Sequence, residues 1–185
     1  VKLVSIMKGE TIFYLIMSVF LSFFCLFAFV LFPNYQYFHL DPAYAKYLGS
    51  LYPNLKWFIL LLSNWSFSLF YIIAELWPNA VFALLFWQFV NKITTVEESK
   101  RFYPLFGLLG QTGLYIAGTF LMNLSNISNY IIGNFAANAD KSVVSIQIVI
   151  SVVLVLGLLA LVAFWLINTK ILDEETINNL KFKVK

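Results

Sequence analysis

The sequence predicts an all-α polytopic membrane protein with four transmembrane helices. Hydrophobic residues make up 61% of the 185 residues, and charged residues make up only 11%. A soluble domain of this size cannot hide so much apolar surface, because much of its area faces water. The apolar residues also form four long runs with few or no charges, each long enough to cross a hydrocarbon core of about 30 Å. We therefore expect a membrane domain over residues 1–168 and a charged cytoplasmic tail or linker over residues 169–185.

The first run covers residues 11–32, carries no charge and stops at the turn signal Pro33-Asn34. At about 22 residues it is too long for the core of a signal peptide, so we interpret it as a spanning helix. The chain begins with Val1 rather than Met, which favours a piece of a longer protein.

The second run covers residues 57–90, and Glu75 is its only charged residue. At 1.5 Å per residue it could extend roughly 50 Å, which exceeds the hydrocarbon thickness. We therefore expect a long helix that is tilted or kinked and that projects from the membrane.

The third run covers residues 102–124 and is rich in glycine. Gly113 and Ala117 are four residues apart, and Gly110 lies on an adjacent turn. Small residues at this spacing let membrane helices approach closely, so we expect a helix-packing face, with a hinge as the alternative. The fourth run, residues 142–168, is uncharged and rich in valine and leucine.

The basic residues indicate which side of the membrane each loop faces. In a four-span arrangement, nine of the twelve lie on one side and three on the other. The richer side is expected to be cytoplasmic, which places both ends of the chain there. The nine are Lys2, Lys8, Lys92, Lys100, Arg101, Lys170, Lys181, Lys183 and Lys185; the three are Lys46, Lys56 and Lys141.

Glu75 is the main candidate for a functional residue, because a charge in mid-membrane costs about 3 kcal/mol even by insertion scales. Such residues line solute pathways, carry ions or protons, or pair with buried cations. Pro78 lacks an N–H group, so we expect a kink and a freed carbonyl at Ala74. Ser68 and Asn79 lie seven residues before and four after Glu75 and can share its face. We interpret these residues as a substrate pathway; the alternative is a protonated or hydrogen-bonded glutamate that only joins helices.

Other chemistries have little support in the sequence. No lysine or arginine lies within any run, and no Gly-x-x-x-x-Gly-Lys-Ser/Thr phosphate loop is present. Cys25 is the only cysteine, and His39 stands alone in a loop. We therefore expect no enzyme activity, no metal, no cofactor and no nucleic-acid partner.

The middle of the chain resembles the bacterial and plastid-type ADP/ATP translocases, a family of nucleotide transporters. The likeness is strongest over residues 52–110. Its blocks, in order, are Tyr52-Pro53-Asn54, Lys56-Trp57-Phe58, Ala74-Glu75-Leu76-Trp77, Leu85-Phe86-Trp87-Gln88-Phe89, Asn91, Ile93-Thr94 and Glu98-Ser99-Lys100-Arg101-Phe102-Tyr103-Pro104-Leu105-Phe106-Gly107.

The resemblance implies part of a twelve-span carrier of major-facilitator design, in which the four runs are the third to sixth spans of the N-terminal half. It implies ATP and ADP as substrates, exchange or proton-coupled import as the activity, and the missing helices and the lipid bilayer as partners. The expected location is the bacterial inner membrane, or alternatively the plastid inner envelope. Of the charged residues that serve binding in the family, only Glu75 has a match here. Pro78 departs from the glycine that usually follows Glu-Leu-Trp.

Two predictions have alternatives: the role of three basic residues and the function of the whole chain. Lys92, Lys100 and Arg101 could form a basic cytoplasmic mouth that gathers anionic nucleotide. The alternative, which we favour, is the ordinary positive-inside signal, joined by local pairing with Glu97 and Glu98. For the whole chain, the competing hypothesis is a non-transporting membrane protein, either a truncated remnant or a helper subunit.

Overall fold

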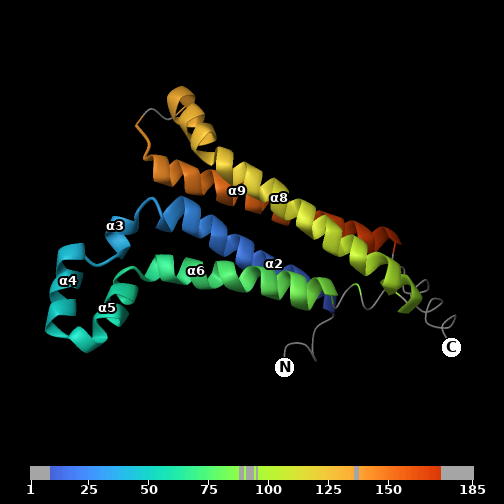
Figure 1. Ribbon diagram of the computed structural model, residues 1–185, viewed down its shortest axis with the longest axis horizontal. Coiled ribbons are helices and arrows are strands. Elements are labelled where there is room, and N and C mark those ends of the chain that lie inside the picture. Colours follow the sequence, from blue (N-terminus) through green and yellow to red (C-terminus); the bar gives the residue numbers. More distant parts are fainter. Residues whose placement is uncertain (1–8, 88–89, 91–93, 95, 136–137, 172–185) are drawn as a thin grey trace.

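The computed structural model describes residues 9–87, 90, 94, 96–135 and 138–171. This part of the chain is helical and contains no strand, which confirms the all-α prediction. Three helical segments are long and apolar enough to cross a membrane: Thr11–Leu31, Glu97–Phe135 and Lys141–Thr169. A bent pair, Pro53–Ser63 with Trp65–Val81, brings the number to four if it counts as one span. The long helices run along a common axis, and a smaller helical segment extends past one end (Figure 1).

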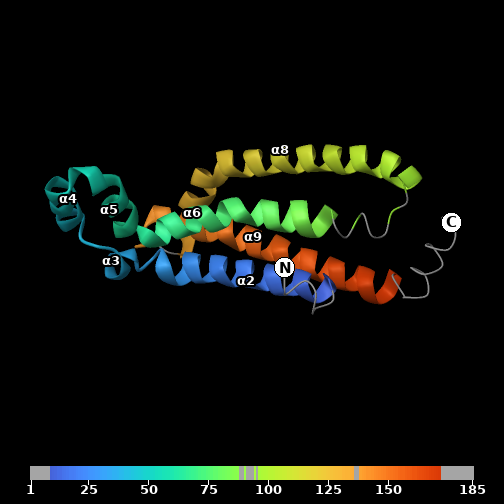
Figure 2. The ribbon, with the colours of Figure 1, turned by 90° about the horizontal axis from the view of Figure 1, so that it is seen from below.

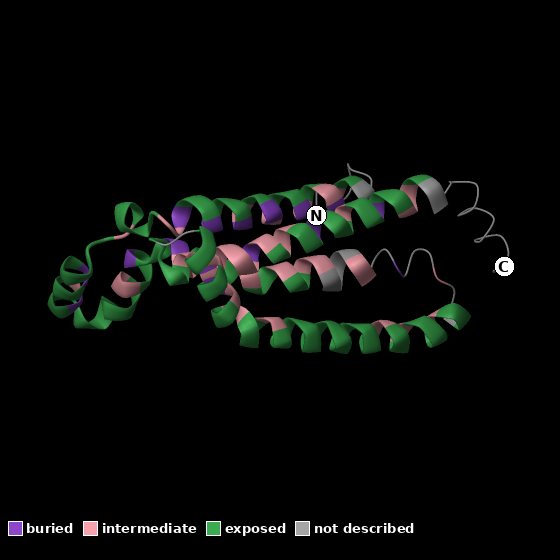
Figure 3. Cartoon of the chain, turned by 90° about the horizontal axis from the view of Figure 1, so that it is seen from above, coloured by how far each residue is buried: buried purple, intermediate pink, exposed green. Residues whose placement is uncertain are grey.

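Helix α2 (Gly9–Leu26) and the π-helical turn η1 (Phe27–Leu31) form the first candidate span. Aromatic side chains contribute to their packing against α6 (Trp65–Pro78) and against α9 (Lys141–Leu166). Phe13 stacks on Phe164 with 4.0 Å between ring centroids, and Phe27 stacks on Phe70 at 4.1 Å. Most of the buried residues lie where these helices meet (Figure 3).

One glycine leaves room for a neighbouring side chain in this packing. A Cβ atom added at Gly157 of α9 would lie 2.5 Å from Leu21 Cδ2, so the missing side chain lets α2 approach α9 closely.

A helical hairpin follows the first span. It consists of α3 (Tyr35–Phe38), α4 (Pro42–Leu51), the 3-10 turn η2 (Pro53–Leu55) and α5 (Lys56–Ser63). Asp41 caps α4, because its carboxylate accepts hydrogen bonds from the backbone N–H groups of Ala43 (2.7 Å) and Tyr44 (3.2 Å). The hairpin lies beyond the end of α2 and α6 (Figures 1 and 2).

The second apolar run is divided at Asn64. The axis of Pro53–Ser63 is bent by 76° from that of Trp65–Val81, so α5 belongs to the hairpin and α6 (Trp65–Pro78) begins a new direction. Side chains satisfy carbonyl groups at the break: Asn64 Nδ2 donates to Leu60 O at 3.1 Å, and Ser68 Oγ donates to Leu61 O at 3.2 Å.

Pro78, where we expected the kink, lies within the continuous helical segment Trp65–Val81. The backbone N–H of Asn79 bonds to Leu76 O, and the Asn79 side-chain amide donates to Glu75 O at 2.9 Å. Beyond Pro78 the chain continues as the π-helical segment η3 (Asn79–Phe86). Wider turns and a side-chain donor therefore accommodate the proline within this helical segment.

Helix α8 (Val96–Phe135) is longer than the third run, because the polar segment after residue 124 is also helical. It contacts α9 near one end, where Ser128 Oγ lies 2.9 Å from Ser145 Oγ and Lys141 Nζ donates to Ser125 Oγ at 2.9 Å. The ribbon of α8 otherwise runs apart from the other helices, and most of its residues are exposed (Figures 2 and 3). Near its start, the rings of Phe106 and Tyr103 meet those of Phe86 and Trp87 edge-on, with 5.5 Å and 4.8 Å between ring centroids. Helix α9 continues into the π-helical turn η4 (Ile167–Ile171).

Candidate functional site

Glu75 lies on the face of α6 that does not pack against the bundle. The packed face carries Phe70, Ile73, Ala74 and Trp77, which surround the buried core of Phe24, Ala28 and Ile150. Glu75 is exposed, as are Tyr71 and Ile72 one turn before it. Helix α6 therefore holds its carboxylate on the side opposite this packed face.

Glu75 also lies at the middle of the continuous helical stretch formed by α6 and η3. Helix α6 contributes 14 residues and η3 contributes 8, and Glu75 is the eleventh of these 22. At 1.5 Å per residue the carboxylate is roughly 16 Å along the axis from either end. When this helical stretch crosses a membrane, its middle is where an unpaired charge is most costly. A carboxylate there needs a proton, water or a cation to be stable.

Ser68, Pro78 and Asn79 lie on the same helical stretch as Glu75. The polar side chains of Ser68 and Asn79 donate hydrogen bonds to backbone carbonyl groups. Ser68 Oγ bonds to carbonyl groups at the Asn64 break, and Asn79 Nδ2 bonds to the carbonyl of Glu75 itself. Within the described residues, the Glu75 carboxylate has no hydrogen bond or ion pair with a side chain. Whether these residues line a substrate pathway stays a prediction.

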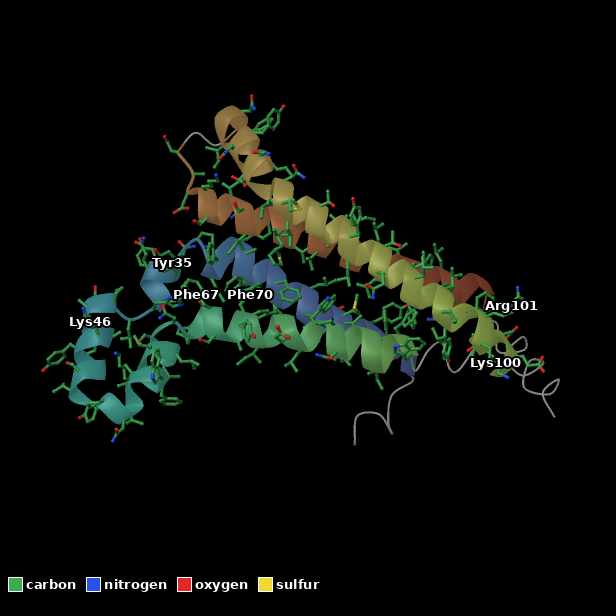
Figure 4. All side chains as sticks on the ribbon, viewed as in Figure 1. Tyr35, Lys46, Phe67, Phe70, Lys100 and Arg101 are labelled. Atoms are coloured by element: carbon green, nitrogen blue, oxygen red, sulfur yellow. The ribbon has the colours of Figure 1, made fainter. Side chains whose placement is uncertain are left out.

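The residues of the predicted basic mouth are only partly described. Lys100 and Arg101 are exposed near the start of α8, and Lys92 lies outside the described residues. Figure 4 places Lys100 and Arg101 at one end of the molecule and Lys46 at the other. This separation agrees with the sorting of basic residues along the sequence, although the sidedness and the mouth itself remain predictions.

The predicted packing face of Gly110, Gly113 and Ala117 is exposed on α8. A Cβ atom added at Gly110 or Gly113 would meet nothing within 4 Å. These positions therefore do not pack against the described helices, and a role in packing requires a segment outside them. Gly157 makes the close contact instead. It lies in a uniform valine–leucine run, so the sequence pattern did not mark it as a packing position.

A second cluster was missed because its members are far apart in the sequence. His39 Nε2 lies 2.7 Å from Ser66 Oγ, and Ser66 is fully buried. The His39 ring also meets the Phe67 ring edge-on, with 4.5 Å between centroids. Burial lowers the pKa of His39, because it penalises the charged imidazolium. The histidine that seemed isolated thus joins the hairpin to the first turn of α6.

Comparison with known proteins identifies relatives over the whole chain. A family model described as TLC ATP/ADP transporter matches residues 1–185, a wider match than the residues 52–110 of strongest likeness. The chain is 64% identical to ADP,ATP carrier protein 4 of Rickettsia felis and 63% identical to that of Rickettsia prowazekii, in both cases over all 185 residues. It is 44% identical over 147 residues to ADP,ATP carrier protein 5 of Rickettsia bellii, which covers 80% of this chain and 29% of the relative. The chain spans 36% of the length of the two carrier protein 4 relatives. No solved structure matches it.

Proposed function

Because the chain belongs to the TLC ATP/ADP transporter family, we propose that it is part of a longer carrier that exchanges ATP for ADP across a membrane. The relatives carry the name ADP,ATP carrier protein, and the chain matches them over its full length. In this proposal the described helices belong to the N-terminal half of a twelve-span carrier in a bacterial inner membrane, and both ends of the chain face the cytoplasm.

One observation supports the mechanism: the Glu75 carboxylate lies exposed at the middle of a helical stretch whose opposite face is packed. A carboxylate is a poor direct ligand for a triphosphate, since like charges repel. We propose that Glu75 pairs with a lysine of a helix outside this chain, or carries a proton. Nucleotide phosphate entering the site then competes for that lysine.

This exchange of partners provides a coupling between binding and conformation. When phosphate replaces the carboxylate on the lysine, the contact between the two helices is released, and the halves of the carrier can rock about a site near the midplane. When ATP or ADP leaves, the ion pair forms again and favours the starting arrangement. The basic residues Lys92, Lys100 and Arg101 raise the local concentration of anionic nucleotide at the cytoplasmic entrance.

Counter-exchange in liposomes tests the proposed activity. A carrier of the relatives' full length that contains this chain is reconstituted, and uptake of labelled ATP is measured with and without ADP inside the liposomes. An exchanger takes up label only when ADP is inside. A proton-coupled importer takes up label into empty liposomes when a pH gradient is applied. A helper or remnant gives no uptake under either condition.

A further inference from the structure

The outward face of α5 is apolar. Trp57 is 79% exposed and Phe58 is 60% exposed, and Leu61 and Leu62 are exposed beside them. The other side of α5 faces α4, where the Lys56 side chain fits over Gly49. In water, contiguous apolar surface of this kind is uncommon on a folded protein and marks a contact with something else.

Helix α4 has the same character on one side. Tyr44, Tyr47 and Leu51 follow one another at spacings of three and four residues, which places them on one face, and all three are exposed. Lys46 and Ser50 fall on a different part of the helix surface. The hairpin thus combines exposed tyrosine and tryptophan with a few polar groups, as do segments that lie at the boundary between lipid and water.

The direction of α5 fits that boundary. Its axis is bent by 76° from that of Trp65–Val81, so when α6 crosses the membrane, α5 lies nearly in the membrane plane. The 22 residues of α6 and η3 extend roughly 33 Å, about the thickness of the hydrocarbon core. The first turn of α6 is therefore at the edge of the hydrocarbon, and α5 joins it at that level.

Three hydrogen bonds attach residues 38–40, which precede α4, to the junction of α5 and α6. Trp65 Nε1 donates to Phe38 O at 2.9 Å, the backbone N–H of Leu40 donates to Ser63 O at 3.3 Å, and His39 is bonded to Ser66. The hairpin consequently has a defined direction relative to α6.

We propose that the α4–α5 hairpin is an interfacial anchor, in which the apolar faces of both helices lie against lipid at the end of α6. Trp57 and Phe58 insert just below the headgroups, and Lys46 and Lys56 extend toward the phosphates. Lys56 Nζ lies over the Trp57 ring, 5.8 Å from its centroid, so this ammonium and the indole lie at the same level of the boundary. The anchor fixes the depth and tilt of α6 in the bilayer. The proposal needs a membrane but does not depend on the transported substrate.

Site-directed spin labelling of the whole chain tests the anchor. The background is Cys25→Ser, and single cysteines are introduced as Phe58→Cys, Leu61→Cys, Lys46→Cys and Val19→Cys, each at an exposed position. Each nitroxide-labelled chain is reconstituted in vesicles of phosphatidylcholine with phosphatidylglycerol. Collision rates are measured with oxygen, which concentrates in lipid, and with a neutral nickel chelate, which stays in water.

At Phe58 and Leu61 we expect high oxygen and low nickel collision rates, at a depth shallower than that of the α2 label at residue 19. At Lys46 we expect a nickel collision rate several-fold higher than at Phe58. Equally high nickel collision rates at Phe58 and Lys46 would place the hairpin in water. Low rates with both reagents at Phe58 and Leu61 would mean that protein covers the face. Either result overturns the proposal, and two labels on one face guard against a local effect of a single substitution.

Discussion

The Nε2 atom of His39 lies 2.7 Å from the hydroxyl oxygen of Ser66, although 27 residues separate them in the chain. Ser66 is fully buried, so removing its hydroxyl leaves the histidine nitrogen without this partner. We expect Ser66→Ala to weaken the attachment of the hairpin by about 1–3 kcal/mol. Faster hydrogen exchange at the amide of Leu40, which bonds to Ser63 O, would report the loss. Ser50→Ala, at an exposed hydroxyl, serves as the control and should leave that exchange rate unchanged.

The same attachment should depend on pH. The pKa of His39 is lowered from its ordinary value of 6.5 by burial, so the attached state favours the neutral ring. A group of this kind contributes its full stability above pH 6.5 and loses it as the pH falls through the lowered value. After correction for intrinsic exchange, Leu40 protection should fall on acidification below pH 6.5. His39→Gln should abolish this dependence; an unchanged acid response in that variant would show that another group is responsible.

The glycines of α8 and α9 should respond differently to alanine. In Gly157→Ala the new methyl group would meet Leu21 Cδ2, so we expect a loss of about 1–3 kcal/mol in the free energy of unfolding. In Gly113→Ala the methyl group meets nothing within 4 Å, and we expect no loss, or a gain of up to about 1 kcal/mol from helix propensity. Unfolding of the purified chain by denaturing detergent, followed by circular dichroism, measures both. Equal losses in the two variants would mean that α8 packs as tightly as α9.

Pro78 should control the hydrogen bonding of the helix after it. Pro78→Ala supplies an N–H group for the carbonyl of Ala74 and removes the reason for the wider turns of η3. We expect the free energy of unfolding to rise by at most about 3 kcal/mol, and the amide of residue 78 to be protected from exchange. Pro42→Ala is the matched control, because Pro42 occupies the first turn of α4, where an N–H group has no helical partner. If the two variants behave alike, the proline in α6 does not set the local geometry.

Much of the architecture could be predicted from the sequence, because lipid imposes a simple rule on long apolar runs. The helices over residues 11–31 and 141–169 lie close to the runs expected at 11–32 and 142–168. The break at Asn64 was missed, since it lies within a continuous apolar run and depends on hydrogen bonds from Asn64 and Ser68 side chains. The length of α8 was also missed, because polar residues after position 124 read as a loop but form further helical turns.

The candidate site was predictable only in part. Glu75 could be chosen as a candidate because one acid in an apolar run has few explanations; the structure places it at mid-helix, and its role stays a prediction. Its partner could not be identified, because such a partner would come from outside the described residues. The His39–Ser66 contact depends on how the hairpin folds back on α6, and no local pattern in the sequence encodes it.

Exchange by a full-length carrier with Glu75→Gln tests the central claim most directly. The amide keeps the shape of the side chain but can neither pair with a lysine as an anion nor carry the proton. Glu97→Gln, at an exposed carboxylate in the first turn of α8, is the matched control. With equal amounts of protein in liposomes that contain ADP, we expect labelled ATP uptake to fall by at least about tenfold in Glu75→Gln, a change of about 1.4 kcal/mol in the barrier, and to stay at the unmodified rate in Glu97→Gln. Uptake by Glu75→Gln at the unmodified rate would contradict the account.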